Sequence, residues 1–406
     1  MEFKNLKLVA PLLKALRQQQ YTQPTPIQQQ AIPAALQYKD ILACAQTGTG
    51  KTAAFALPVL QTLYNNRLNG DTSRQIRALI LTPTRELAIQ IEESFKSYGT
   101  YTGLKSLAVF GGVSQYHQVK QLQQGVDILI ATPGRLLDLV TQRRLSLQYV
   151  KTLVLDEADR MLDMGFINDV RKIIGRLPQQ RQTLFFSATM PPGIIHLSQS
   201  ILNNPVRIEI TPISTTAETV EQAIYFVEKS DKRSLLIHLL KNNIDTALVF
   251  TETKFGADKL CAALRRENIK VQAIHGNKSQ AERQKALLNF KNKHINVLVA
   301  TDIAARGIDI ESLSHVINFE LPNIPETYVH RIGRTGRAGA NGKAISFCGM
   351  EEKTLLRDIH KLIARSIPVM KDHPFEMEHA EVTVPSKMLV SHRLITRKRN
   401  KTFRQL

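Results

Sequence analysis

Short apolar runs rich in β-branched residues recur along the chain, and each is followed by a turn and then by a helical pattern. In the first half these runs cover residues 40–45, 77–81, 126–130, 152–155 and 183–186. The alternation restarts with residues 247–250, 271–274, 295–300, 315–319 and 343–347. Buried strands that alternate with helices are typical of parallel βαβ units. The pattern therefore predicts an α/β protein with two tandem domains, each a parallel sheet flanked by helices.

A stretch of Thr, Ser and Pro without helical or strand periodicity separates the two halves. It predicts a linker over residues 210–218, a first domain over 1–209 and a second over 219–370. The pattern dissolves after Pro368, and residues 385–406 contain seven Lys or Arg and no acid. We therefore expect residues 371–406 to form a basic, flexible tail.

The chain carries 54 basic and 35 acidic side chains, a formal net charge of +19. This charge favours polyanionic partners, above all nucleic acid, although a basic surface can also serve solubility alone. Cys44, Cys261 and Cys348 stand singly and lack the spacing of a zinc site or disulfide framework. With no signal pattern and no apolar run of about 18 residues, we expect a cytoplasmic protein without a membrane partner.

One apolar run leads directly into a glycine-containing loop that ends in Lys-Thr at the expected start of a helix. Gly48 and Gly50 would turn backbone N–H groups toward phosphates, Lys51 would neutralise the β- and γ-phosphates, and Thr52 would bind Mg²⁺. Two glycines alone could be ordinary turn residues, but the complete arrangement predicts nucleotide binding. The predicted loop consists of Ala45, Gln46, Thr47, Gly48, Thr49, Gly50, Lys51 and Thr52.

Asp156 and Glu157 directly follow another apolar run, at the strand end where open α/β sheets bind ligands. Asp156 would hold Mg²⁺ together with Thr52, and Glu157 would orient or deprotonate an attacking water. Two acids after a strand can also cap a helix. The phosphate loop upstream favours nucleotide hydrolysis.

With the tetrad from Asp156 to Asp159 following this loop, the chain resembles the DEAD-box ATP-dependent RNA helicases from about residue 1 to about residue 370. The resemblance implies two RecA-like domains and an RNA-dependent ATPase that converts ATP to ADP and phosphate. Residues 26–33 and 274–280, with the short basic tail, are most similar to the bacterial RhlE-type subgroup.

By the same resemblance, the amide of Gln28 recognises adenine and the ring of Tyr21 stacks on the base. Phe3 stands where the family carries an upstream aromatic that packs near this motif, although a lone Phe can be a simple hydrophobic anchor. The family also assigns Asp309 to the ATP ribose.

Further motifs of the resemblance connect hydrolysis to domain closure. Ser187 and Thr189 would link the tetrad, through Asp159, to the second domain, where His330 lies in an arginine-rich motif. Like charges packed this closely favour a nearby anion, and the family directs Arg334 and Arg337 to the γ-phosphate as arginine fingers. The expected catalytic residues are Lys51, Asp156, Glu157, Arg334 and Arg337.

The resemblance finally implies contacts to the RNA backbone, which carry no base readout. Arg85 and Glu86 could instead form a local ion pair, and Gly111 with Gly112 could be an ordinary turn. The expected RNA-binding residues are Thr84, Arg85, Gly111, Gly112, Thr132, Arg135, Thr251, Gln280, Arg283, Thr301 and Asp302.

ATP and RNA bound to both domains would close them, which predicts local, non-processive separation of short RNA duplexes or RNA–protein remodelling. Two alternatives remain: a DNA helicase or translocase of the same superfamily, and a nucleotide-gated clamp within ribonucleoprotein particles. We expect a monomer. Ribosomal precursors and the RNA-decay machinery are compatible partners, because backbone contacts do not select an RNA sequence.

Overall fold

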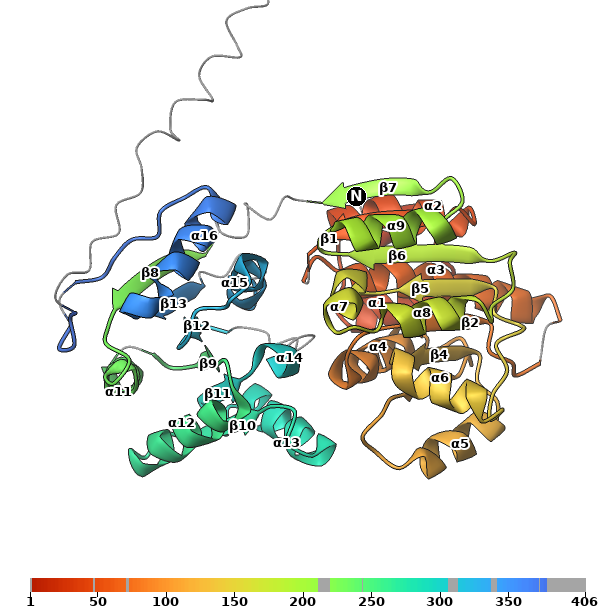
Figure 1. The fold of residues 1–406 in the computed structure, drawn as a ribbon. Helices are drawn as coiled ribbons and strands as arrows, with labels where there is room; N and C mark the ends of the chain where they lie inside the picture. The colour runs from red at the N-terminus through yellow and green to blue at the C-terminus, as the bar shows by residue number, and fades with distance from the viewer. Residues whose placement is uncertain are drawn as a thin grey trace, which may run out of the picture.

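The computed structural model describes residues 2–46, 48–70, 73–210, 220–242, 244–305, 313–336, 342–371 and 373–377. Within these ranges the strands form two separate parallel sheets, each flanked by helices (Figure 1). The predicted fold class is confirmed.

The first sheet has seven strands in the order β3-β4-β2-β5-β6-β1-β7, and every neighbouring pair is parallel. Its central strands are buried along their whole length, as expected for a sheet covered on both faces. The strands are β1 (Ile41–Ala45), β2 (Ala78–Leu81), β3 (Ser106–Val109), β4 (Ile128–Ala131), β5 (Thr152–Leu155), β6 (Gln182–Ser187) and β7 (Val206–Ile210).

Two apolar cores cover the two faces of this sheet. The short 3-10 helix η1 (Phe3–Leu6) and four helices pack on one face: α1 (Ala10–Gln18), α2 (Pro26–Leu36), α3 (Lys51–Leu68) and α4 (Arg85–Tyr98). The other face is covered by α5 (Gln115–Gln123), α6 (Pro133–Thr141), α7 (Ala158–Asp163), α8 (Ile167–Ile174) and α9 (Pro192–Ile201).

The second sheet has six strands in the order β10-β11-β9-β12-β13-β8, again all parallel. They are β8 (Glu221–Phe226), β9 (Ala247–Phe250), β10 (Val271–Ile274), β11 (Val297–Ala300), β12 (His315–Asn318) and β13 (Lys343–Cys348). Helices α11 (Lys232–Asn242) and α12 (Lys254–Arg266) cover one face. The other face carries α13 (Gln280–Lys291), α14 (Asp302–Ala305), α15 (Pro325–Ile332) and α16 (Lys353–Ile363), which η2 (Met350–Glu352) directly precedes.

The apolar runs predicted ten strands and missed β3, β7 and β8. All three lie at the edge of a sheet. An edge strand is less enclosed than a central one, so partly exposed positions interrupt its apolar run, as in β7 and β8. The central strands, which are enclosed on both faces, carry the signal that the sequence reveals.

The chain regions outside the two sheets are described only in part. Ile210, which the sequence assigns to the linker, is the last residue of β7, and residues 211–219 lie outside the described ranges. Val369 forms a parallel bridge with Ile224 of β8, so the chain still pairs with the sheet beyond α16. Met377, in the predicted tail, is buried, and residues 378–406 are not described. The domain and tail boundaries therefore stay predictions.

The strand order divides the carboxyl edge of the first sheet into two parts. Strands β5, β6 and β1 are consecutive neighbours, so the loops that follow them meet at one end of this edge. Strands β2, β4 and β3 form the remaining part, and their following loops meet beside the first group. The fold thus gathers the predicted nucleotide residues in one place and the predicted RNA residues of this domain in another.

Candidate functional site

The predicted phosphate loop joins β1 to α3 in the conformation its glycines allow. Gly48 and Gly50 have φ values of 89° and 90°, a region that strains other residues. Lys51 begins α3, is buried, and donates a 2.9 Å hydrogen bond from Nζ to the carbonyl of Ala45. Thr52 follows in the first turn of the helix and is partly buried. Thr47 lies outside the described residues.

Gln28 connects helix α2 to this loop. Its Oε1 accepts a 3.0 Å hydrogen bond from the Thr25 backbone N–H, as part of a capping box. Its Nε2 donates a 3.1 Å hydrogen bond to the carbonyl of Gly50. A Cβ at Gly50 would lie 2.4 Å from this nitrogen, so the close approach also requires glycine. The predicted recognition of adenine by Gln28 stays a prediction.

Tyr21 and Phe3 form an aromatic cluster with Tyr98 of α4. Both Phe3 and Tyr98 meet the Tyr21 ring edge to face, at centroid distances of 6.2 and 5.9 Å. The hydroxyl groups of Tyr21 and Tyr98 are 3.1 Å apart. Phe3 is buried, Tyr21 is half-exposed, and both line a hollow of about 410 Å³ with Arg17 and Gln20. Phe3 is therefore both an anchor and part of the predicted adenine region.

Asp156 lies at the end of β5, almost fully buried. Among the described residues its Oδ1 atom has no hydrogen-bond partner. Burial raises the pKa of Asp156 to about 6, although the nearby positive charge of Lys51 opposes the rise. A buried, unpartnered carboxylate oxygen beside a lysine suits a cation or a group carried by a ligand.

Glu157 has a left-handed backbone, with φ 54° and ψ 50°, that precedes α7. Its Oε2 accepts a 2.9 Å hydrogen bond from Arg160, one turn along, and both side chains are buried. Burial alone would raise the pKa of Glu157, but the positive charges of Arg160, Lys51 and Arg334 together lower it. Glu157 is thus held as a carboxylate. The strained backbone is of the kind that collects at functional sites.

Asp159 is bound to the loop after β6, as the motif order predicts. The backbone N–H and the hydroxyl of Thr189 donate hydrogen bonds of 2.8 and 2.9 Å to Asp159 Oδ2. The hydroxyl of Ser187 accepts from the Asp159 backbone N–H at 3.2 Å and donates to the Thr189 carbonyl at 2.7 Å. A movement of the tetrad would therefore be transmitted to this loop.

The arginine-rich segment of the second domain faces the tetrad of the first. Arg334 and His330 lie around a small cavity whose wall also includes Arg160. Burial and the positive charge of Arg160 lower the pKa of His330 to about 4, so the imidazole is neutral at physiological pH. Arg334 is buried and contributes to the low pKa of Glu157. The predicted residues Arg337 and Asp309 lie outside the described residues.

A buried polar contact joins the two domains between α4 and α13. Arg283 Nη2 lies 2.8 Å from Glu86 Oε2, and Gln280 Nε2 donates a 3.0 Å hydrogen bond to Glu86 Oε1. Glu86 therefore has its ion pair with the second domain, and the local pair with Arg85 considered from the sequence is not formed here. Since the side chains of Gln280 and Arg283 are engaged with Glu86, their predicted contact with RNA stays a prediction.

The RNA residues predicted in the first domain lie together on one part of the sheet edge. Thr84 caps α4 by accepting from the Leu87 backbone N–H at 3.3 Å. Gly112 has a φ of 75°. A Cβ at this position would lie 2.0 Å from the guanidinium of Arg85, so glycine is needed to leave room for this arginine. Gly111 precedes it in the loop after β3. Thr132 and Arg135 come from the start of α6, after the neighbouring strand β4.

The corresponding residues of the second domain also follow neighbouring strands. Thr251 follows β9, and Thr301 follows β11; both are buried. Asp302 accepts two hydrogen bonds from Arg331, of 2.6 and 2.8 Å. The Asp302 carboxylate, which was predicted to contact RNA, is thus engaged in a bidentate ion pair.

Arg160 and Arg331 are functional candidates that the sequence reasoning did not single out. Arg160 stands three residues after Glu157, a spacing that brings the two side chains together on a helix. That spacing was a usable signal. Arg331 belongs to the arginine-rich motif, but its role could not be read locally, because its partners Asp302 and Asn318 lie on other segments of the chain.

Two family models match the chain. The DEAD/DEAH box helicase model matches residues 25–196, and the helicase conserved C-terminal domain model matches residues 231–339. Among curated relatives, the DEAD-box ATP-dependent RNA helicase RhpA of Helicobacter pylori is 44% identical over 357 residues. That alignment covers 87% of this chain and 71% of the relative.

Solved structures of two similar proteins differ in how closely they superpose on the whole chain. S. cerevisiae Dbp5 bound to RNA and ADP BeF3 superposes with a TM-score of 0.81 at 32% identity, covering 91% of this chain and 95% of Dbp5. A DEAD box protein from the hyperthermophile Methanococcus jannaschii is 40% identical but gives a TM-score of only 0.54, covering 91% and 99%. The domain arrangement described above is thus closer to that of the RNA-bound protein.

Proposed function

The chain belongs to the DEAD-box family of RNA helicases, and from this premise we propose that it is an ATP-dependent RNA-remodelling enzyme whose catalytic site is completed by domain closure. One observation carries the proposal: Arg160 of the first domain lines one small cavity with His330 and Arg334 of the second, and the charge of Arg334 lowers the pKa of Glu157. A nucleotide held between the domains would contact both halves and would stabilise the closed arrangement.

The side chains present at the site suit hydrolysis of the γ-phosphoryl group. Lys51, now bonded to the Ala45 carbonyl, would turn to the β- and γ-phosphates when ATP displaces that contact. Glu157, held ionised by its positive neighbours, would orient the attacking water and accept its proton. Arg334 would stabilise the charge that develops on the transferred phosphoryl group.

The residues at the strand ends also fit Mg²⁺. Asp156 offers a buried carboxylate oxygen without a partner among the described residues, and Thr52 offers a hydroxyl beside the phosphate loop. In the described ranges no group of three or more His, Cys, Asp or Glu could hold a metal ion. When bound, Mg²⁺ would neutralise charge on the phosphates.

RNA would bind along the second part of the sheet edges, through the backbone and without sequence preference. Thr84, Arg85 and Arg135 in the first domain, with Thr251 and Thr301 in the second, would hold one strand. Domain closure brings Glu86 into contact with Arg283. It would hold the bound strand in a conformation that prevents base pairing with the complementary strand. Duplexes would therefore be separated locally, without processive translocation of the protein along the strand.

A strand-displacement assay on a short RNA duplex tests this function, with a matched DNA duplex for comparison. We expect ATP-dependent displacement of RNA and none by Glu157→Gln, which keeps the side-chain volume and removes the carboxylate. RNA-stimulated hydrolysis without displacement would favour the nucleotide-gated clamp. Equal displacement of long DNA would contradict the assignment to RNA.

The cellular setting belongs to the same proposal. No helix in the described residues is long and apolar enough to cross a bilayer. We place the protein in the cytoplasm as a monomer of the RhlE-type subgroup, acting on ribosomal precursors or RNA that is being degraded. Recovery of crosslinked RNA from cells would identify the target. An RNA pool with no enrichment over cells that lack the tagged protein would contradict a defined target.

A further inference from the structure

An aromatic side chain stands exposed beside the RNA residues predicted in the first domain. Tyr116 lies in the first turn of α5, and 66% of its surface is accessible. The neighbouring His117 ring meets it edge to face, at a centroid distance of 5.4 Å. An exposed aromatic ring offers a flat face on which the ring of a ligand can stack.

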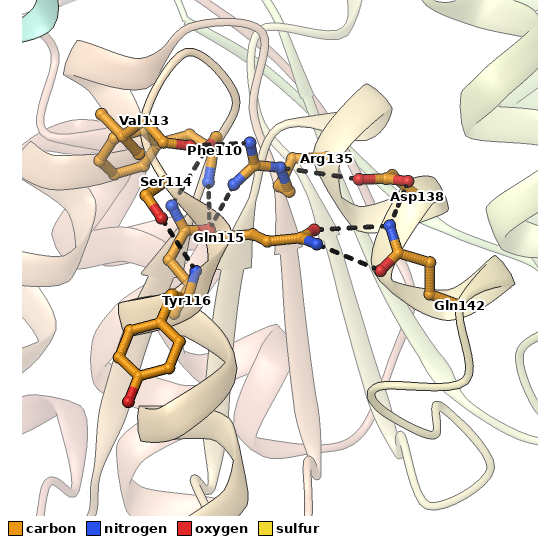
Figure 2. Close-up of polar contacts among 9 residues, drawn as sticks. Phe110, Val113, Ser114, Gln115, Tyr116, Arg135, Asp138 and Gln142 are labelled. Atoms are coloured by element: carbon orange, nitrogen blue, oxygen red, sulfur yellow. Dashed lines mark hydrogen bonds and ion pairs between the residues drawn. The ribbon is translucent and has the colours of Figure 1, made fainter.

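The loop that carries Tyr116 is tied to the predicted RNA residues by hydrogen bonds (Figure 2). Arg135 donates from Nη2 to the carbonyl of Val113 at 3.0 Å and from Nη1 to Gln118 Oε1 at 3.3 Å. Gln118, buried behind the loop, bonds both the N–H and the carbonyl of Phe110. The loop that contains Gly111 and Gly112 is therefore fixed relative to α5.

A second set of bonds holds the start of α5 itself. The hydroxyl of Ser114 accepts from the Tyr116 backbone N–H at 3.3 Å, and the Gln115 and Gln142 amides exchange two hydrogen bonds of 3.3 and 3.4 Å. Figure 2 shows the Tyr116 ring pointing away from these polar contacts. Its backbone is thus positioned while its ring remains available.

The charge around this ring favours a polyanion. From Gly111 to Val126 the sequence contains no acid, and Lys120 is exposed one turn beyond Tyr116 on α5. Arg143 and Arg144, also exposed, directly follow Gln142, which is bonded to Gln115. The nearest acids in sequence are engaged: Asp127 pairs with Arg74 at 2.8 Å, and Asp138 lies 4.0 Å from Arg135. Aromatic rings beside basic side chains are a common platform for single-stranded nucleic acid.

We propose that Tyr116 is a base-stacking site that extends the RNA-binding surface beyond the backbone contacts of Gly111, Gly112 and Arg135. It would take one unpaired nucleobase of a strand already held across the two domains. The inference rests on the proposed function, since it needs RNA on this edge. Stacking tolerates any base, so the site would add affinity and retain RNA without adding sequence preference.

The test compares RNAs of different length on the full-length protein with a non-hydrolysable ATP analogue. One oligouridylate is just long enough to fill the two-domain surface. Two longer RNAs extend it, one at the 5′ end and the other at the 3′ end, and each carries a fluorescent adenine analogue in the added part. We expect one lengthened RNA to bind more tightly and its fluorophore to be quenched. Tyr116→Ala should remove both effects, with an affinity loss of about 5- to 10-fold, while Tyr116→Phe keeps them.

Matched controls separate this outcome from its alternatives. Tyr38 is similarly exposed, at 63%, but precedes β1 toward the opposite edge of the sheet, so Tyr38→Ala should change nothing. Lengthening with abasic nucleotides should give no gain that depends on Tyr116. Equal affinity of wild type and Tyr116→Ala for every RNA, as expected if the ring docks a protein, would overturn the proposal. Absence of any RNA-stimulated hydrolysis in wild type would instead overturn the proposed function.

Discussion

The guanidinium of Arg283 in the second domain lies 2.8 Å from the carboxylate of Glu86 in the first, and both side chains are at least nine-tenths buried. The two charges lose their water only when the domains meet. A buried charge left without its partner is costly, on the order of 3–5 kcal/mol. Removing either partner would therefore destabilise the closed arrangement specifically, at a point away from the catalytic acids.

The first prediction concerns this pair. We expect Glu86→Gln to weaken RNA binding about 10-fold or more in the presence of a non-hydrolysable ATP analogue, and much less without nucleotide, because only the closed form contains the contact. Fluorescence anisotropy measures both affinities. Glu92→Gln, which removes a partly exposed pair with Lys96 on the same helix, is the control. An equal loss with and without nucleotide would contradict a role in closure.

The second prediction concerns the Arg160 guanidinium beside Glu157. Its positive charge lowers the pKa of that carboxyl against the effect of burial, so Arg160→Gln should raise the pKa of Glu157. The acidic limb of the pH profile of kcat should therefore move to higher pH, and turnover should fall more at pH 6 than at pH 8. Arg160→Lys should keep the original limb. A proportional loss at every pH would show that Arg160 acts only through packing.

The third prediction concerns the stability cost of Asp156. Burial raises the pKa of Asp156 to about 6, so the folded protein favours the neutral carboxyl and loses stability as pH rises from about 4 through 6. Asp156→Asn should increase the free energy of unfolding at pH 7.5 by roughly 1–3 kcal/mol and abolish ATP turnover. Urea denaturation measures the gain, which should shrink as pH falls toward 4. A gain independent of pH would refute the electrostatic explanation.

The fourth prediction concerns Lys51 in the phosphate loop. Its replacement by alanine removes the charge expected at the β- and γ-phosphates and the 2.9 Å bond to the Ala45 carbonyl. We expect no measurable ATP turnover, with or without RNA, in a protein whose circular dichroism spectrum is unchanged. Normal turnover in this variant would mean that the loop does not hold the nucleotide.

The fifth prediction concerns the basic end of the chain. Removal of residues 385–406 takes away seven basic side chains and no acid. Each of these side chains that pairs with an RNA phosphate should contribute roughly 1 kcal/mol or less, so truncation should lower RNA affinity and make its dependence on salt shallower. ATP turnover at saturating RNA should stay the same. Unchanged RNA affinity at low salt would eliminate a role of the tail in binding.

Much of the architecture is readable from the chain because the central strands are enclosed on both faces. Strands such as β5 and β9 are continuous apolar runs, and the structure places both at their predicted bounds. The edge strands β7 and β8 carry a weaker signal, because partly exposed positions interrupt them. Strand order depends on long-range packing, which no local pattern encodes.

The sequence by itself determined the chemistry that short segments contain: the phosphate loop around Lys51, the acids after β5, and the family to which they belong. A loop of contiguous residues carries its own geometry, so its spacing is informative. Only the tertiary structure decided which distant groups meet. Gln280 and Glu86 are 194 residues apart, and Tyr116 gains its position through Arg135. Such contacts arise from strand order and domain closure, whose free energy is spread over the whole molecule.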